Sequence, residues 1–258
     1  MVDSAIIGYG IVGKATAKTL GIEKYFDLKG SNITLKEAAR YRFIFGCLPT
    51  PVKEGTYDTS AIEGIVKQLQ EERFGGIFIN RSTVLPGFAR HLMGNYGVIV
   101  VSNPEFLSEQ TAEFDAKHPD FVVIGGDVPS NAKAVRGIYE SRFKGLDVIE
   151  TDTVTAEMIK ISMNAFYLTK VVFANEIYDL CQRNGANYEQ VKESIYKNRY
   201  GTKNHFDIWH KGGRGAGGRC LSKDFQAFAT YANSGLLSLI AQKNKFLLET
   251  YPKTNDRR

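Results

Sequence analysis

Short apolar runs alternate with helix-like stretches along the first 150 residues of the chain. The runs are Ala5–Ile7, Tyr25–Leu28, Arg42–Cys47, Gly76–Ile79, Val98–Val101, Phe121–Ile124 and Val148–Ile149. Alternation of this kind is typical of βαβ units that form one sheet. We therefore expect an α/β domain over residues 1–150, built on a doubly wound, mostly parallel sheet.

The pattern changes after Asp152 to longer stretches with a 3.6-residue period. Three helices are predicted, over Thr155–Asn184, Tyr188–Tyr196 and Lys223–Glu249, and they form a smaller all-helical domain over residues 151–258. Between the last two lies Asn198–Arg219, rich in Gly, Asn, His and Arg. A segment this long and polar is typical of a functional loop or of disorder.

Composition narrows the functional classes. The chain has 258 residues, 43% of them hydrophobic, and its formal charge of +5 is spread along the sequence rather than gathered in a block. This argues against a nucleic-acid arm, and no apolar run approaches the length of a membrane span. The first residues lack a basic leader, so we expect a cytoplasmic protein. Three widely spaced cysteines, Cys47, Cys181 and Cys220, fit neither a disulfide framework nor a metal site, and we expect no bound metal.

The first predicted strand leads into a GxGxxG triple formed by Gly8, Gly10 and Gly13. Asp27 ends the next strand about 20 residues later, which completes the βαβ fingerprint of a Rossmann-like dinucleotide site. The aspartate favours NAD over NADP because it accepts from a ribose hydroxyl and repels a 2′-phosphate, although Lys29 softens that preference. The alternative is a glycine-rich turn without a ligand.

Polar segments follow three of the predicted strands. They are LPTP at 48–51, RSTVLPG at 81–87 and NPEFLSE at 103–109. Ligands of open parallel sheets bind beyond the carboxyl ends of the strands, so these segments predict a lined cleft at that edge. Ordinary turn chemistry is the alternative.

The helical half carries two further candidates. Glu157, Lys160 and Asn164 share one face of a helix, for which the alternative is a solvated face with an intrahelical ion pair. Cys220 follows a run of glycines at the mouth of a helix, next to Lys223. A helix N-terminus and neighbouring cations favour the thiolate, so Cys220 is a candidate nucleophile.

Six motifs in order extend over nearly the whole chain: GYGIVG, LPTP, STVLPG, NPEFLSE, AEMIKISMNAF with FANE, and GGRCLSKD. With these motifs the chain resembles the UDP-glucose/GDP-mannose 6-dehydrogenase family. The resemblance implies oxidation of the C6 alcohol of a nucleotide sugar to a carboxylate with two NAD. UDP-glucose converted to UDP-glucuronate for polysaccharide biosynthesis is the expected reaction.

The resemblance also implies roles for single residues. It makes Cys220 the nucleophile that forms a thiohemiacetal and a thioester, and Glu109 the carboxylate that activates water for thioester hydrolysis. The implied catalytic set is Cys220, Lys160, Asn164, Asp224, Glu109 and Thr83. The implied cofactor set is Gly8, Gly10, Ile11, Val12, Gly13, Asp27, Thr50, Thr83 and Lys223, and the implied substrate set is Glu105, Phe106, Leu107, Lys160, Asn164, Arg199, Gly215 and Gly217.

The chain also departs from the family pattern. Members of the family usually carry a further C-terminal nucleotide-binding domain, which this sequence does not include; we expect either that the domain has been dropped or that a separate chain supplies it. Arg219 and Ser222 replace the usual neighbours of the cysteine. By resemblance we expect a homodimer through the helical domain, with Lys223–Glu249 as the dimer helix and Phe246, Leu247 and Leu248 exposed on it.

Two other functions stay open. A two-electron dehydrogenase of the 3-hydroxyacid type would share the Rossmann and helical domains and the pair Lys160 and Asn164, but it would not need Cys220. A non-catalytic nucleotide-binding remnant would not need Lys160, Glu109, Cys220 and Asp224 together.

Overall fold

The computed structural model describes residues 3–108, 110–199, 201, 204–210, 212–217 and 221–252. The chain divides into two compact units, residues 1–53 with 57–160 and residues 54–56 with 161–258. The boundary falls inside the long helix α7 (Thr153–Asn184), whereas the sequence places its division slightly earlier, after residue 150.

The first unit is built on a seven-stranded sheet in the order β2-β1-β3-β6-β7-β8-β9. Its strands are β1 (Ser4–Ile7), β2 (Tyr25–Phe26), β3 (Phe43–Gly46), β6 (Ile77–Asn80), β7 (Ile99–Ser102), β8 (Phe121–Gly125) and β9 (Asp147–Thr151). All neighbours are parallel except β7 and β8, where Ser102 pairs with Gly125 in antiparallel register. The predicted mostly parallel α/β sheet is confirmed.

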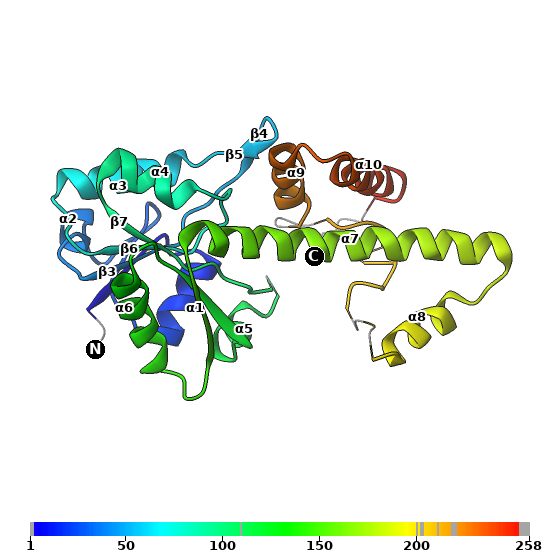
Figure 1. Ribbon diagram of the computed structural model, residues 1–258, viewed down its shortest axis with the longest axis horizontal. Helices are drawn as coiled ribbons and strands as arrows, with labels where there is room; N and C mark the ends of the chain where they lie inside the picture. The colour runs from blue at the N-terminus through cyan, green and yellow to red at the C-terminus, as the bar shows by residue number, and fades with distance from the viewer. Residues whose placement is uncertain are drawn as a thin grey trace. The chain divides into compact units, whose positions relative to one another are not determined.

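Helices cover both faces of this sheet (Figure 1). They are α1 (Ile11–Leu20), α2 (Leu35–Ala38), α3 (Ser60–Glu71), α4 (Phe88–Tyr96), α5 (Ala112–Lys117) and α6 (Pro129–Glu140). Successive side chains of a strand point to opposite faces, so Ile44 and Phe45 enter different cores. Phe45 packs with residues of α1 and α6, and Ile44 with residues of α2, α3 and α4. A two-stranded ribbon, β4 (Val52–Lys53) with β5 (Thr56–Tyr57), was not predicted.

The second unit is helical. The part of α7 beyond residue 160 packs with α8 (Tyr188–Lys197), α9 (Leu221–Ala232) and α10 (Gly235–Thr250). Leu168 and Val172 lie in one core with Phe225 of α9, and Cys181 lies in another with Tyr188 of α8. No helix in the described parts of the chain is long and apolar enough to cross a membrane.

The prediction of a single helix over Lys223–Glu249 is wrong, because two helices, α9 and α10, occupy this stretch. The first ends at Ala232, and Asn233 follows with a left-handed φ of 45°. Ser234 then begins α10, its hydroxyl accepting the N–H of Leu237 at 3.5 Å. Asparagine tolerates the left-handed region and serine is a good N-cap, so these two residues separate the two helices. The spacing of apolar residues nevertheless continues through the break, which is why the sequence predicted one helix. Leu247, expected to be exposed, is fully buried.

Candidate functional site

The glycine turn between β1 and α1 has the geometry of a phosphate site. Gly8 has φ +91°, and a Cβ there would lie 2.4 Å from the carbonyl oxygen of Cys47. A Cβ on Gly13 would lie 2.0 Å from the carbonyl oxygen of Gly8, whereas one on Gly10 would meet no atom within 4 Å. Gly10 is the N-cap of α1 and provides no side-chain cap, so the helix presents its first N–H groups next to open space.

The glycines of this turn predict a contrast between two alanine variants. Gly13→Ala should lower the free energy of unfolding by about 1–3 kcal/mol, because a backbone atom has to move to admit the methyl group. Gly10→Ala should leave stability within about 0.5 kcal/mol, since its backbone is extended and the space beside it is open. Urea denaturation of both variants measures the difference, and equal losses would contradict the turn geometry.

Asp27 follows β2 directly and faces the glycine turn. Its carboxylate accepts the N–H of Lys29 at 2.8 Å and the N–H of Tyr9 at 2.7 Å. These two hydrogen bonds hold the pKa of Asp27 below its ordinary value, so the group is ionised at neutral pH. The residue that sequence analysis assigned to a ribose contact therefore also joins the second strand to the turn. Ile11 and Val12 begin α1 beside it, Ile11 largely exposed and Val12 half-buried.

Hydrogen bonds tie together the loops that follow β3 and β6. The Ser82 hydroxyl donates to the carbonyl oxygen of Leu48 at 2.7 Å and accepts the Leu48 N–H at 3.0 Å. The Thr50 hydroxyl, which is buried, donates to the carbonyl oxygen of Thr83 at 2.8 Å. The two threonines predicted to contact the cofactor are thus brought together at the carboxyl edge of the sheet.

The buried guanidinium of Arg81 contacts Asn103, the first residue of the loop that follows β7. One guanidinium nitrogen of Arg81 donates to the side-chain oxygen of Asn103 at 2.6 Å and to the Tyr139 hydroxyl at 2.7 Å. The amide of Asn103 donates in turn to the carbonyl oxygen of Val123 at 2.7 Å. Sequence analysis did not assign these residues, although Arg81 and Asn103 stand in two of the polar segments that it singled out. Their network holds the start of the loop that carries Glu105.

Lys160 and Glu105 form a charged pair in the first unit that is largely shielded from solvent. The Lys160 Nζ lies 3.4 Å from Glu105 Oε1 and 5.4 Å from the centre of the Phe106 ring. The other carboxylate oxygen of Glu105 accepts the N–H of Leu107 at 2.7 Å. Lys160 is 6% exposed, so the ammonium is largely shielded from solvent beside the segment predicted to line the sugar pocket.

The helix face that carries Lys160 is not a solvated one. Glu157, Lys160 and Asn164 are all buried, and Lys160 pairs with Glu105 rather than within its helix. The Glu157 carboxylate accepts the N–H groups of Gly87 and Ala89 instead. The alternative of an exposed face with an intrahelical ion pair is therefore wrong.

In the second unit, Asn164 and Asp224 form a buried pair. The Asn164 amide donates to Asp224 Oδ2 at 2.6 Å, and Lys223 forms an ion pair with the other carboxylate oxygen. Asp224 is 1% exposed and lies in the first turn of α9. Asn164 of the predicted site is thus in contact with Asp224, 60 residues away in the sequence, and Asp224 with its neighbour Lys223.

The glycine-rich segment before α9 is held by side chains that sequence analysis missed. The Asn244 side chain accepts the N–H of Ala216 at 2.8 Å and donates to its carbonyl oxygen at 3.0 Å. Gly215 has φ +86°, and a Cβ there would crowd Asn244 and Leu247. Arg214 is 2% exposed and pairs with Asp179 at 2.7 Å. The sequence carries no local signal for the roles of Asn244 and Arg214, because their partners lie in other segments.

Arg199 lies in the segment that directly follows α8. It lines an open pocket of about 590 Å³ together with Glu193, Tyr196, Lys197, Asn198 and Gly201. Gly217, also assigned to the substrate loop, is half-buried. Two of the predicted catalytic residues, Glu109 and Cys220, lie outside the described residues.

Two family models match the chain. Residues 22–143 match the NAD-binding domain of the UDP-glucose/GDP-mannose dehydrogenase family, and residues 154–246 match the central domain of the same family. The first match begins after the glycine turn, so the geometry of that turn is independent support for the cofactor site.

Curated relatives are similar over most of the chain. The UDP-glucose 6-dehydrogenase of Rickettsia prowazekii is 31% identical over 211 residues, which is 78% of this chain and 47% of the relative. The UDP-glucose 6-dehydrogenase TuaD of Bacillus subtilis is 33% identical over 74% of this chain and 42% of the relative. The chain thus spans about half the length of the curated relatives it matches.

Solved structures share the fold. A UDP-glucose dehydrogenase from Pyrobaculum islandicum superposes with a TM-score of 0.82 at 24% identity, covering 97% of this chain and 68% of the other. A 3-hydroxyisobutyrate dehydrogenase from Mycobacterium tuberculosis superposes with a TM-score of 0.72 at 16% identity, covering 96% of this chain and 94% of the other.

Proposed function

The chain belongs to the UDP-glucose/GDP-mannose dehydrogenase family, and on that premise we propose that it oxidises a nucleotide sugar at C6 with NAD. UDP-glucose is the proposed substrate and UDP-glucuronate the proposed product, supported by the names of the relatives at 31–33% identity. The observation that carries the proposal is the pair of the buried Lys160 with the partly buried Glu105 beside Phe106, within the unit that holds the dinucleotide turn.

The cofactor predicted from the sequence, NAD, is confirmed by the match to the family's NAD-binding domain. The residues present fit it: Gly10 leaves space at the uncapped start of α1, and Asp27 has an ionised carboxylate beside the turn. Bound there, NAD would accept a hydride from the substrate carbon in each of two oxidations. In the proposal the glycine turn holds the pyrophosphate, Asp27 accepts from a ribose hydroxyl, Thr83 lies near the nicotinamide and Thr50 contacts the cofactor.

The first oxidation needs a group that removes the proton of the C6 hydroxyl as the hydride leaves. We assign this role to Asp224 acting with Lys160 through a water molecule. The Asp224 carboxylate is held by Asn164, which fixes its direction. The Lys160 ammonium and the Asn164 amide are suited to the oxygen that becomes negative in the tetrahedral intermediates, because each is a buried hydrogen-bond donor.

The second oxidation takes place on Cys220. Its thiolate adds to the aldehyde carbon and forms a C–S bond, which gives a thiohemiacetal. Loss of a second hydride from that carbon gives a thioester. Glu109 then takes one proton from water, whose oxygen attacks the thioester carbon; the C–S bond breaks, the thiolate is released, and the acid product loses the second proton of the water to solvent to become the carboxylate.

The reaction can be tested with the purified chain, NAD and a panel of UDP- and GDP-sugars. Two NADH per sugar consumed, with one sugar preferred, is the expected result. One NADH per molecule with a 3-hydroxyacid would instead favour the two-electron alternative, whose fold the chain shares. No turnover despite NAD binding in a parallel titration would contradict independent catalysis and point to a third domain on another chain or to a nucleotide-binding remnant.

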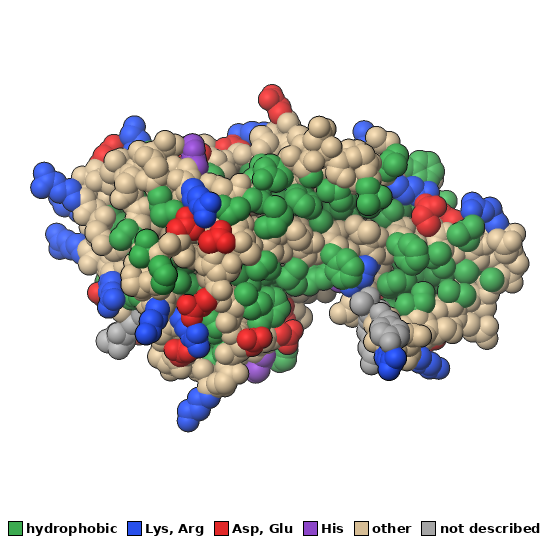
Figure 2. Space-filling view, in the orientation of Figure 1, with side chains coloured by type: hydrophobic (Ala, Val, Ile, Leu, Met, Phe, Trp, Pro, Cys, Tyr) green, Lys and Arg blue, Asp and Glu red, His purple; other side chains and the backbone are tan. Residues whose placement is uncertain are grey.

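The proposal includes a homodimer through the helical unit, acting in the cytoplasm. Phe166, Phe173 and Leu180 recur every seventh residue along α7 and are 53%, 51% and 44% exposed. This spacing places them on one side of the helix, as in helix–helix packing between two copies. Figure 2 shows hydrophobic side chains on the visible face of the molecule along the course of α7.

Phe173→Glu should therefore give a folded monomer, because it puts a charge into the proposed helix–helix contact. Sedimentation velocity on the chain and the variant checks this. Lys133→Glu, an exposed change on α6 of the first unit, should leave the dimer intact. A wild-type chain that sediments as a monomer would overturn the dimer proposal.

A further inference from the structure

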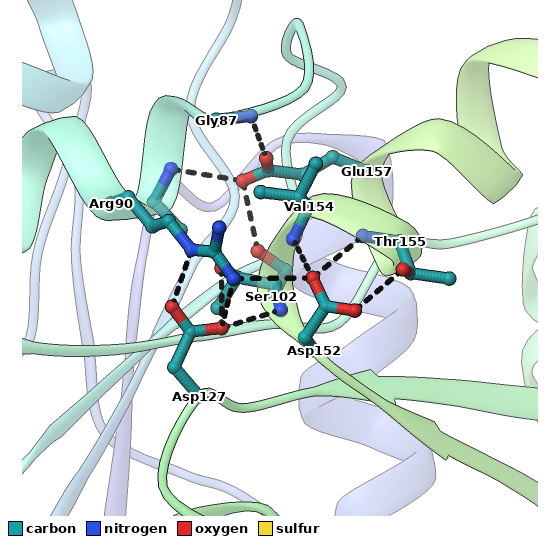
Figure 3. A network of polar contacts seen from close by, with 10 residues as sticks. Gly87, Arg90, Ser102, Asp127, Asp152, Val154, Thr155 and Glu157 are labelled. Atoms are coloured by element: carbon teal, nitrogen blue, oxygen red, sulfur yellow. Dashed lines mark hydrogen bonds and ion pairs between the residues drawn. The ribbon is translucent and has the colours of Figure 1, made fainter.

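Glu157 is a buried carboxylate for which the proposed chemistry has no use. It lies near the start of α7 and is 3% exposed. Its two oxygens accept the N–H of Gly87 at 2.6 Å, the N–H of Ala89 at 2.9 Å and the Ser102 hydroxyl at 3.0 Å. Figure 3 shows the carboxylate between the beginning of α4 and Ser102.

The partners of Glu157 belong to two segments that carry candidate site residues. Gly87 ends the polar loop after β6, in which Thr83 lies. Ser102 is the last residue of β7 and directly precedes the loop that carries Glu105. Glu157 itself precedes Lys160 by one turn of α7. One carboxylate therefore joins three segments that are far apart in the sequence.

The contacts of Glu157 also supply what α4 lacks. The N-cap of α4 is Gly87, with φ 97°. Glycine has no side chain that could accept an N–H, so this helix cannot cap itself. A carboxylate at a helix N-terminus is favoured by the helix dipole as well as by the hydrogen bonds. Burial nevertheless raises the pKa of Glu157 above its ordinary value. The hydrogen bonds of Glu157 form despite this cost of desolvation. They restrict where the start of α7 can lie against α4 and β7.

We propose that Glu157 is a positioning residue: by joining α7 to the start of α4 and the end of β7, which adjoin the loops that carry Thr83 and Glu105, it holds the Lys160 ammonium against Glu105 and Phe106. The inference rests on the proposed function for its effect on catalysis. The alternative is that Glu157 contributes stability only, and a variant at a second carboxylate of the same helix separates the two.

Asp152 is that matched control. Its carboxylate accepts the N–H groups of Val154 at 3.0 Å and Thr155 at 3.1 Å, and so caps the start of α7 (Figure 3). It also contacts Arg90 of α4 at 3.4 Å, but none of its described bonds reaches the loops that carry Thr83 and Glu105. Asp152→Asn should lower stability by weakening a cap, without changing where Lys160 lies.

The experiment compares Glu157→Gln and Asp152→Asn in the full chain. The glutamine keeps the size of the side chain but turns an NH₂ group toward N–H and O–H donors. The first readout is the rate at which acetic anhydride modifies the Lys160 amine, followed by peptide mass spectrometry. The second is kcat and KM for the nucleotide sugar, and the third is NAD affinity.

We expect Glu157→Gln to raise the Lys160 modification rate about tenfold and to lower kcat about tenfold, with NAD affinity within twofold. Asp152→Asn should change each quantity by less than twofold. If Glu157→Gln does not fold, Glu157→Asp, which keeps the charge on a shorter side chain, should show the same changes to a smaller extent.

Equal Lys160 modification rates in the Glu157 variants and Asp152→Asn would overturn the positioning role. Because the modification needs no turnover, it tests the inference even if the wild-type chain oxidises no sugar. In that case the proposed function fails, while the modification rates still decide the role of Glu157.

Discussion

Replacing Cys220 with serine should abolish acid formation, lowering its rate by about three orders of magnitude or more. A serine hydroxyl is far less ionised than a thiol near a helix N-terminus, so it cannot capture the aldehyde at a comparable rate. The first oxidation needs no covalent bond to the protein. Slow release of aldehyde, with at most one NADH per sugar, is therefore expected, and mass spectrometry of the products measures it.

The control for this experiment is Cys181→Ala. Cys181 lies in an apolar core of the helical unit beside Tyr188, so its loss should cost some stability and leave acid formation intact. Undiminished acid production by Cys220→Ser would contradict the covalent mechanism. It would favour a second oxidation that acts on the hydrated aldehyde, without a covalent bond to the protein.

Lys160→Met should lower kcat by about 10²- to 10⁴-fold, because it removes the cation assigned to the developing oxyanion and to the proton of the alcohol. The methionine keeps much of the apolar stem but leaves the Glu105 carboxylate without its ammonium partner. That carboxylate is 14% exposed and still accepts the Leu107 N–H, so we expect a stability loss of about 1–3 kcal/mol. Steady-state kinetics and urea denaturation measure the two effects.

A double variant separates catalysis from stability at this pair. Lys160→Met with Glu105→Gln removes both charges, so much of the stability lost in the single variant should return, while kcat stays low. Recovery of kcat together with stability would mean that Lys160 acts only through the fold. A single variant with wild-type kcat would remove Lys160 from the mechanism.

Local features of the sequence determined the dinucleotide turn. Gly8 has a left-handed backbone, and Gly13 lies too close to the carbonyl oxygen of Gly8 to admit a Cβ. Glycine is the residue that satisfies both conditions without strain, so the motif by itself predicts the geometry of the turn. The alternation of strand and helix patterns likewise predicted the sheet, since strands buried on both faces must be apolar throughout. The break at Asn233 and Ser234 had a local signal too, but the continuing apolar period concealed it.

The tertiary structure alone decided which residues distant in the sequence contact one another. A helical period shows that Glu157, Lys160 and Asn164 share a face, but it cannot show which groups that face meets. Glu157 meets two backbone N–H groups about 70 residues away, and Lys160 meets Glu105. Arg81, Asn244 and Arg214 were missed for the same reason. Residue types and spacings determine the backbone that a segment can form, whereas packing decides which buried charges and amides find one another.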